Sequence, residues 1–346
     1  MKISIIGAGS WGTALANLLA NNQHQVLVYD VDKKVVEEIN NFHTNESKLK
    51  DALLNESVYA TSDLKEVLEF SKIIILSVPT KVVRIVLSNI KEIINESKLF
   101  VNTSKGIEPD TGLRISEIVY EVLTDKYVDS FVALTGPSHA EEVVIGLPTV
   151  VTAASTDIES AKLIQRIFSN DFSFRVYTIN DLIGAELGGA LKNIYAIASG
   201  MLTGLEYGDN ARAALITRAL VEMERLAVAM GASPKTLSGL VGVGDMIVTT
   251  TSYHSRNFQA GLSLAKGNNL QEAIASIPMV VEGARTTLSA YQMARKLNIE
   301  TPIIDAVYQI IYQEKNVKET IKALMKRSLK EEFTELWFFI ILFFFY

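Results

Sequence analysis

Two reactive residue types are scarce in this sequence of 346 residues. It contains no cysteine, which excludes disulfide bonds, thiolate-bound zinc, iron–sulfur clusters and a cysteine nucleophile. Its 4 histidines never form a His-x-x-x-His pair, so a transition-metal site has little support. We therefore expect no metal cofactor.

The sequence also lacks a large excess of charge of either sign. Its 33 Lys and Arg residues and 39 Asp and Glu residues give a formal net charge of −6. This balance provides no global field that favours nucleic acid, and we expect no nucleic-acid partner. The composition, 48% hydrophobic and 21% charged, is typical of globular proteins. At about 150 residues per domain, the length predicts two domains.

Long hydrophobic runs are rare. The exception runs from Leu336 to Tyr346 and is too short for a bilayer, which takes about 20 residues to cross, so we expect no stable membrane insertion. We interpret residues 334–346 as an anomalous apolar tail, with a weak membrane or partner anchor as the alternative. Three glycines interrupt the apolar stretch near the N-terminus. That interruption argues against a signal peptide, and we predict a cytoplasmic location.

The hydrophobic periodicity changes along the chain. In the first half, short β-branched runs alternate with helical spacing, which predicts βαβ units. From residue 181 onward, helical periodicity dominates. The sequence therefore predicts an α/β domain over residues 1–179, with a Rossmann-like, doubly wound, mostly parallel sheet, and an all-α domain over 180–333. The expected strands are 2–6, 26–29, 73–78, 99–103, 131–135 and 174–178.

A glycine fingerprint follows the first expected strand. Gly7, Gly9 and Gly12 stand directly before a helical pattern, the context in which glycines let a dinucleotide pyrophosphate approach a helix N-terminus. Asp30 ends the second strand, where a carboxylate accepts hydrogen bonds from the adenosine ribose. Because Val31 follows it instead of an arginine, NAD is slightly favoured over NADP. The alternatives are a purely structural turn and a solvated acid.

Three further loops at strand ends contain polar residues, 77–80, 103–106 and 136–140, at the edge where ligands bind such sheets. Lys105 comes after the strand 99–103, where a cation can meet an anionic substrate. The alternative is a solvated surface lysine. The segment Gly136 to Ala140 follows the strand 131–135.

Lys192 shares one face of an expected helix with Gly188 and Gly189. Interior glycines cost about 1 kcal/mol each, so the pair predicts a close approach by a ligand or another segment, with Lys192 pointing into the gap. A lysine held there is a candidate general acid or base. The alternative is a helix crossing with Lys192 snorkelling to water.

Two clusters in the helical half complete the set of candidates. The first runs from Gly242 to Asp245, and the second is Ser255-Arg256-Asn257. The forked donors of Arg256 match phosphate oxygens, and Asn257 adds another donor. Alone, this second cluster is a weak indication of a phosphate site.

Together, the motifs resemble one family, the soluble NAD(P)-dependent sn-glycerol-3-phosphate dehydrogenases of bacterial type. The resemblance covers about residues 1–333, and the segments that carry it begin at Gly7, Ser104, Gly136, Gly188, Gly242, Ser255 and Val280. The apolar tail has no counterpart in the family pattern. The valine after Asp30 departs from the basic residue or histidine of many members that use NADP.

The resemblance implies a role for each matching residue. Lys192 is the implied proton acceptor in glycerol 3-phosphate oxidation, with Lys105 and Asp245 near the reacting oxygen. Arg256 and Asn257 are implied to hold the substrate phosphate. Further substrate contacts are implied for Gly136, Ser138 and Ser255, and cofactor contacts for Ser10, Trp11, Lys105, Ala140, Arg256, Val280 and Glu282.

The implied activity interconverts glycerol 3-phosphate and dihydroxyacetone phosphate by hydride transfer with NAD or NADP, and supplies glycerol 3-phosphate for phospholipid synthesis. A dehydrogenase of another small hydroxy acid and a non-catalytic NAD(H)-sensing module are the alternatives. We also expect a homodimer formed through the helical domain, which is predicted to serve both substrate binding and dimerisation.

Overall fold

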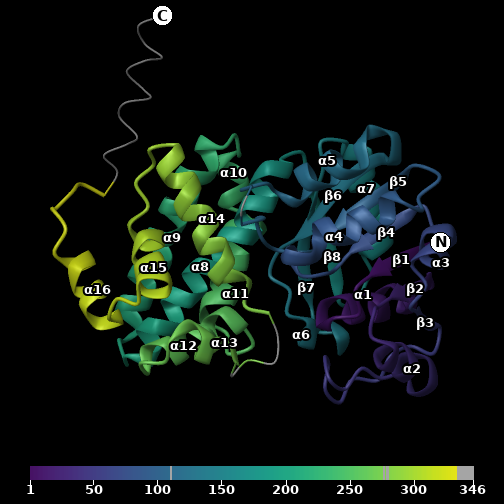
Figure 1. The fold of residues 1–346 in the computed structure, drawn as a ribbon, viewed down its shortest axis with the longest axis horizontal. Helices are drawn as coiled ribbons and strands as arrows, with labels where there is room; N and C mark the ends of the chain where they lie inside the picture. The colour runs from purple at the N-terminus through teal and green to yellow at the C-terminus, as the bar shows by residue number, and fades with distance from the viewer. Residues whose placement is uncertain (110, 276, 278–279, 333–346) are drawn as a thin grey trace, which may run out of the picture.

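The N-terminal half of the molecule is built on one eight-stranded sheet (Figure 1). The computed structural model describes residues 1–109, 111–275, 277 and 280–332, so the predicted tail over 334–346 lies outside the described residues. The strands lie in the spatial order β3-β2-β1-β4-β5-β6-β7-β8. Their bounds are β1 (Lys2–Ile6), β2 (Gln25–Tyr29), β3 (Val58–Thr61), β4 (Ile73–Leu76), β5 (Lys98–Asn102), β6 (Val128–Thr135), β7 (Thr149–Ala154) and β8 (Phe174–Ile179).

The sheet confirms the predicted doubly wound, mostly parallel architecture. Neighbouring strands pair in parallel throughout, except for β6 and β7, which are antiparallel. All four residues of β4 and all five of β5 are buried, because helices cover both faces of the sheet. The prediction missed β3 and β7, and it extended the strand at 73–78 two residues too far.

Two layers of helices sandwich the sheet. Apolar side chains of α1, α2, α6 and α7 pack in the core on one face, and those of α3, α4 and α5 pack in the core on the other. The bounds are α1 (Ser10–Asn21), α2 (Lys33–Phe42), α3 (Leu64–Phe70), α4 (Thr80–Lys91), α5 (Ile115–Tyr127), α6 (Ala140–Val144) and α7 (Ile158–Phe168).

The strand order reverses beside β1, which lies between β2 and β4. The loops after β1 and β4 therefore leave the carboxyl edge of the sheet in opposite directions, and the crevice between them is where ligands of open α/β sheets bind. Ser77 and Val78, which were predicted to end a strand, lie in the loop after β4 instead.

The C-terminal half is helical, as predicted, and the described residues after 179 contain no strand. Its central helix, α8, is buried on nearly every side, as expected for a helix that is apolar all round. A domain boundary near residue 179 stays a prediction. The helices are α8 (Leu182–Gly204), α9 (Asp209–Ala229), α10 (Pro234–Leu237), the π-helical turn η1 (Leu240–Gly244), α11 (Asp245–Thr251), α12 (Arg256–Ala265), α13 (Leu270–Ala275), α14 (Glu282–Lys296), α15 (Pro302–Gln313) and α16 (Val317–Met325).

The close approach predicted at the glycines of α8 is present. A Cβ atom on Gly188 would lie 2.8 Å from the side chain of Val241, and one on Gly189 would lie 2.8 Å from Thr135 Oγ1. The glycines therefore let α8 pack tightly against η1 and against the end of β6, which places Lys192 beside the carboxyl edge of the sheet.

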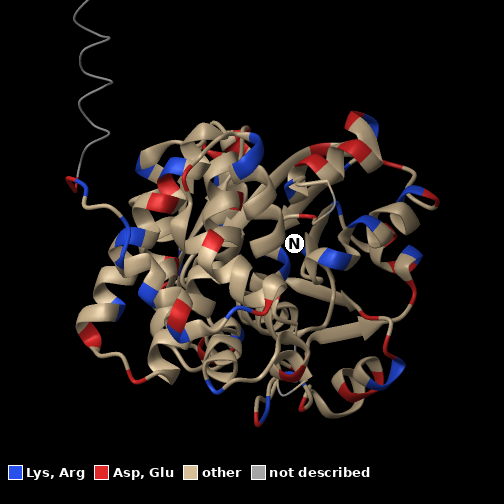
Figure 2. Cartoon of the chain, turned by 60° about the vertical axis from the view of Figure 1, so that its left-hand side comes forward, with Lys and Arg blue, Asp and Glu red and all other residues tan. Residues whose placement is uncertain are grey.

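The surface is mixed in charge. Figure 2 shows basic and acidic residues interspersed along the chain in both halves of the molecule. Within residues 1–332, leaving aside the gaps in the described ranges, no helix combines the length and the apolar character that a membrane span requires.

Candidate active site

The glycine loop after β1 has the geometry that the fingerprint predicts. Gly7 has a φ of +108°, a conformation that L side chains rarely adopt. A Cβ atom on Gly12 would lie 1.9 Å from the carbonyl oxygen of Gly7, whereas Gly9 has no atom within 4 Å of its Cβ position. Gly7 and Gly12 thus shape the turn, and Gly9 leaves space for a ligand.

A cavity of about 600 Å³ extends from this loop across the switch point. Its lining includes Gly7, Gly9, Ser10, Trp11, Asp30, Ser77, Lys105, Arg256, Val280 and Glu282. Gly9 precedes α1 without a capping side chain, so no cap occupies the helix N-terminus, where anions are favoured. Trp11 Nε1 is buried and has no hydrogen-bond partner within the described part of the chain. These features fit a dinucleotide.

Asp30 secures the glycine loop as well as lining the cavity. Its carboxylate accepts hydrogen bonds from the backbone N–H groups of Ala8, at 2.8 Å, and Asp32, at 3.0 Å. Each carboxylate oxygen has further acceptor capacity for ribose hydroxyls. Val31 beside it is 78% exposed at the rim.

A second cavity, of about 210 Å³, shares Trp11, Lys105, Arg256, Val280 and Glu282 with the first. It brings together residues that lie far apart in the sequence. These residues follow β5 and β6 or lie at or on the helices α8, α11 and α12. Those that the sequence predicted and that have not yet been placed are Ser138, Ala140, Lys192, Asp245, Ser255 and Asn257, together with Lys105 and Arg256. Ala140 lines only this smaller cavity, although it was predicted as a cofactor contact.

Two lysines share one buried carboxylate in the smaller cavity. Asp245 is 0% exposed, and it accepts hydrogen bonds from Lys192 Nζ through Oδ1 and from Lys105 Nζ through Oδ2, the latter at 3.0 Å. Lys192 also donates to Thr249 Oγ1 at 2.9 Å. Both lysines are therefore held at one point, where their charges favour an oxygen with developing negative charge.

The environment brings Lys192 into the range of a general acid or base. Burial lowers its pKa to about 7, with the Lys105 cation acting in the same direction and Asp245 opposing the shift. The snorkelling alternative is wrong, because the side chain is 5% exposed and its Nζ is bound to Asp245.

The cluster at residues 255–257 lies at the N-terminus of α12. The Ser255 hydroxyl caps this helix by accepting a hydrogen bond from Phe258 N at 3.3 Å. The Arg256 guanidinium lies between the two cavities and donates to Ser10 Oγ at 3.3 Å. The Asn257 amide donates to Asn193 Oδ1 and accepts from Gly283 N, so one of its N–H groups remains for a ligand.

Two predicted residues act on the site from just outside the cavity walls. Gly12 shapes the glycine turn without lining either cavity, and Gly136, with a φ of +143°, does not line them either. The carbonyl oxygen of Gly136 nevertheless accepts hydrogen bonds from Lys105 Nζ at 3.0 Å and from Ser138 Oγ at 2.9 Å. It therefore helps to position the lysine.

Sequence reasoning missed two residues that complete the cluster. Thr249 lies one turn after Asp245 on α11, a spacing that could have suggested it. Asn193 follows Lys192 directly, and it links Asn257 to the backbone oxygen of Lys105. No pattern in the sequence indicates the link through Asn193, because it joins three separate segments of the chain.

Glu282 connects the helical half to the sheet domain. Its carboxylate accepts a hydrogen bond from Thr80 N at 2.9 Å, at the start of α4. Burial raises the pKa of this carboxyl, while the hydrogen bond from Thr80 opposes the shift. Glu282 thus closes one wall of both cavities.

Comparisons with known proteins agree with this arrangement. The family models described as NAD-dependent glycerol-3-phosphate dehydrogenase N-terminus and C-terminus match residues 2–161 and 181–322. The glycerol-3-phosphate dehydrogenase (NAD(P)+) of Macrococcus caseolyticus is 49% identical over 96% of this chain and 100% of its own length. The namesake from Lysinibacillus sphaericus is 49% identical over 97% of this chain and 99% of its own.

A solved structure extends the likeness to three dimensions. The crystal structure of glycerol-3-phosphate dehydrogenase from Coxiella burnetii has a TM-score of 0.90 and 36% identity, over 94% of this chain and 99% of that one. Since both halves of the sequence match, and relatives of nearly equal length share about half of their residues with it, the chain belongs to the NAD-dependent glycerol-3-phosphate dehydrogenase family.

Proposed function

We propose that this protein interconverts sn-glycerol 3-phosphate and dihydroxyacetone phosphate with NAD or NADP as the redox partner. The observation that carries the proposal is the Lys192–Asp245–Lys105 cluster, which lies where a dinucleotide-sized cavity meets a smaller polar one. A dinucleotide-sensing module needs no such buried acid–base group beside its ligand.

Lys192 is the proposed proton-transfer group. During oxidation its neutral amine takes the proton from the C2 hydroxyl of the substrate, and during reduction its ammonium returns a proton to the forming alkoxide. A nicotinamide cofactor held in the larger cavity would supply the hydride chemistry at C2. Lys105, which is paired with Asp245, stabilises the negative charge that develops on the C2 oxygen.

The phosphate of the substrate is proposed to bind at the N-terminus of α12. Arg256 offers a planar fork of donors, and Asn257 offers its remaining N–H group. The free N–H groups of the first turn add further donors. Phosphate held there fixes the distance from Lys192 to the reacting carbon, which is how binding energy far from the reaction accelerates it.

The experiment is the loss of NADH or NADPH absorbance when purified protein is mixed with dihydroxyacetone phosphate. We expect oxidation of both cofactors, with NADH favoured slightly, because Asp30 and Val31 provide no cation for a 2′-phosphate. A protein that binds NADH but oxidises it with no phosphorylated ketose would contradict the proposal. Turnover of a carboxylate-bearing hydroxy acid instead would identify a different substrate class.

Lys192→Ala tests the assigned role directly. We expect turnover to fall by about 10²- to 10⁴-fold with NADH binding retained. Lys98→Met is the matched control, because Lys98 is also a buried lysine but donates to the carbonyl oxygens of Leu68 and Ser71, away from both cavities. It should keep turnover within about threefold of the parent while lowering stability. Unchanged turnover in Lys192→Ala would remove the lysine from the role.

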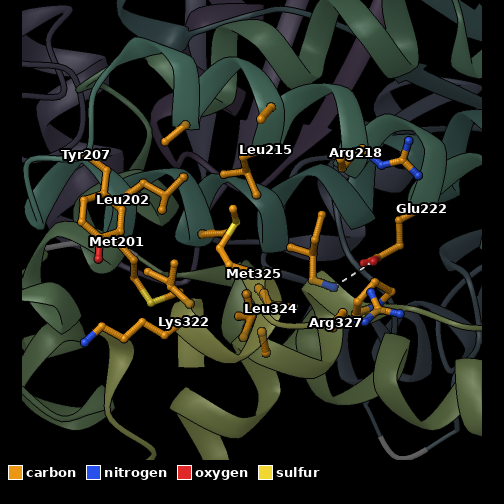
Figure 3. A pocket seen from close by; sticks show the side chains of 18 of the residues that line it. Met201, Leu202, Tyr207, Leu215, Arg218, Glu222, Lys322, Leu324, Met325 and Arg327 are labelled. Atoms are coloured by element: carbon orange, nitrogen blue, oxygen red, sulfur yellow. Dashed lines mark hydrogen bonds between the residues drawn. The ribbon is translucent and has the colours of Figure 1, made fainter. Parts of the chain in front are cut away.

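The proposal includes assembly and cellular context. We infer a homodimer formed through the helical half, a cytoplasmic location, and a contribution of glycerol 3-phosphate to phospholipid synthesis. Support for the dimer comes from an apolar cavity of about 860 Å³ between α8, α9, α15 and α16, which is far larger than the substrate cavity. Figure 3 shows Met201, Leu202, Leu215 and Met325 around this space, with Arg218, Lys322 and Arg327 near its edges.

A further inference from the structure

His139 stands in the wall of the substrate cavity without an assigned task. It lines this cavity together with Lys105, Lys192 and Asp245. Its Nε2 atom is buried and has no hydrogen-bond partner among the residues that the structure describes. A buried ring nitrogen without a partner is unfavourable by about 1–3 kcal/mol, so its position calls for a ligand.

The backbone holds His139 firmly in this wall. It occupies the N-cap position of α6, directly after Ser138 and three residues after Gly136. The imidazole of His254 packs against it, with ring centroids 5.7 Å apart and the planes tilted by 52°. The ring of His139 is therefore confined on one side by His254, and the residue lines a polar cavity.

The surroundings of His139 favour the neutral form of its imidazole. Burial lowers its pKa, and the cations Lys192 and Lys105 act in the same direction against the weaker effect of Glu141 and Glu142. A neutral imidazole has one N–H donor and one acceptor nitrogen, which suits an uncharged hydroxyl better than a phosphate. The two lysines and Arg256 already supply the cations of the cavity.

The substrate of the proposed function has three polar groups. Its phosphate is assigned to Arg256 and Asn257, and its C2 oxygen to Lys192 and Lys105. The primary hydroxyl at C1 has no protein partner so far. Among the described residues of this wall, only Trp11 and His139 have a buried side-chain nitrogen without a partner. Trp11 also lines the dinucleotide cavity, which leaves His139 for the C1 hydroxyl.

We propose that His139 hydrogen-bonds the C1 hydroxyl of the substrate and thereby makes the enzyme selective for a hydroxymethyl group at this end. The inference rests on the proposed function and adds a specificity residue to it. An analogue that carries a methyl group at C1 would leave Nε2 buried and unpaired, which is how a site built for a hydroxyl rejects the molecule that lacks it.

The test compares dihydroxyacetone phosphate with hydroxyacetone phosphate, in which a methyl group replaces the hydroxymethyl group. The kcat/KM for NADH oxidation is measured for both compounds with the parent, His139→Phe, His139→Gln and His254→Phe. Where the analogue is turned over too slowly, its inhibition constant against dihydroxyacetone phosphate replaces kcat/KM. His254→Phe is the control, because that ring is exposed and lies in the same cavity.

We expect the parent to prefer dihydroxyacetone phosphate, and His139→Phe to reduce this preference by about 10- to 100-fold. The loss should fall on kcat/KM for the hydroxylated substrate and leave the analogue nearly unchanged. His139→Gln, which retains a donor and an acceptor, should restore part of the preference. His254→Phe should keep it.

Equal losses for both compounds, or an unchanged preference in both His139 variants, would overturn the inference while leaving the proposed function intact. A parent protein that reduces neither compound although it binds NADH would overturn the proposed function itself, and the inference with it.

Discussion

At the scale of single residues, the two buried lysines of this protein differ in what surrounds them. The buried charge of Lys98 is compensated by hydrogen bonds to carbonyl oxygens and to Glu96. Lys192, in contrast, shares the carboxylate of Asp245 with Lys105. Because one negative charge serves two cations, the ammonium form of Lys192 is poorly stabilised against the cost of burial. Burial therefore lowers its pKa to about 7, and the shared carboxylate offsets this shift only in part.

The pKa of Lys192 predicts opposite pH profiles for the two reaction directions. Oxidation needs the neutral amine, so its kcat should rise as the pH increases through about 7. Reduction needs the ammonium, so its kcat should fall over the same range. Steady-state kinetics in both directions from pH 5.5 to 9 measures this, with Asp245→Asn as a second variant.

Loss of the Asp245 charge removes the one group near Lys192 that raises its pKa. The midpoint of both profiles should therefore move to lower pH in Asp245→Asn. Profiles that change in the same direction with pH would contradict the role of Lys192 as the proton-transfer group.

The residues of the site differ in how far sequence reveals them. Lys105, Lys192, Asp245 and Arg256 stand in short motifs, and the structure places all four around one cavity. The partners that orient them, such as Asn193 and Thr249, are polar residues of common types whose role depends on segments far away in the sequence. Such contacts follow from packing, and one sequence contains no direct record of them.

At the scale of elements, the crossing of α8 and α12 positions the substrate end of the site. A Cβ atom on Gly200 would lie 2.0 Å from the carbonyl oxygen of Phe258, and one on Gly261 would lie 2.1 Å from that of Ile197. The two helix backbones therefore touch without intervening side chains. This contact places the first turn of α12, with Arg256, beside the helix that carries Lys192.

Gly200→Ala should push these helices apart. We expect a stability loss of about 1–3 kcal/mol from overpacking, together with a higher KM for the phosphorylated substrate, because Arg256 moves with α12. Gly208→Ala is the control, since no atom lies within 4 Å of a Cβ at that position, and it should change stability by less than about 1 kcal/mol. Thermal unfolding and steady-state kinetics check both. A fully stable Gly200→Ala would show that the crossing tolerates a side chain.

Glu222 joins three helices through one buried carboxylate. It accepts hydrogen bonds from the N–H groups of Ile303 and Ile304 at the start of α15, and from the hydroxyl of Tyr195 on α8. Burial nevertheless raises its pKa from 4.5 to about 7. In the range between these values the folded protein keeps a proton that the unfolded chain has released, so this group's contribution to stability declines as the pH rises through that range.

Glu222→Gln should remove this pH dependence. At pH 5 the two proteins should differ little, because the parent carboxyl is protonated and neutral. At pH 8 the free energy of unfolding of the glutamine variant should rise relative to that of the parent. We expect this difference to exceed the one at pH 5 by on the order of 1–3 kcal/mol, because glutamine has no charge to bury. Urea unfolding at both pH values measures the difference. A gap between the proteins that does not change with pH would indicate an unperturbed carboxyl.

The order of helices and strands can be predicted from the sequence where the hydrophobic patterns are long. Continuous apolar strands such as β4 were predicted, and so was the helical character of the C-terminal half. β3 has four residues at the sheet edge with alternating burial, which is too short for periodicity to identify. β7 follows a proline and pairs antiparallel with β6, so no βαβ pattern precedes it.

At the scale of the whole molecule, both halves are needed to form the site. The sheet half contributes Lys105 and Ser10, and the helical half contributes their partners Asp245 and Arg256. A buried link between Arg114 and Glu186, and another between Thr80 and Glu282, join the halves on further sides. The catalytic geometry therefore depends on packing between the halves, and the outer face of the helical half is left for contacts with other molecules.

That outer face leads to the prediction for assembly. Met325 lines the large apolar cavity of the helical half and is 82% exposed in a single chain. Since an apolar surface of this kind favours a self-complementary contact, we expect light scattering to give the mass of a dimer. Met325→Lys should weaken the dimer by about 100-fold or more, because it would bury another cation beside Lys322 and Arg327. Leu53→Lys, at a residue 75% exposed in the sheet half, should leave it intact. A monomeric parent would contradict the proposed dimer, and equal effects of both variants would place the interface elsewhere.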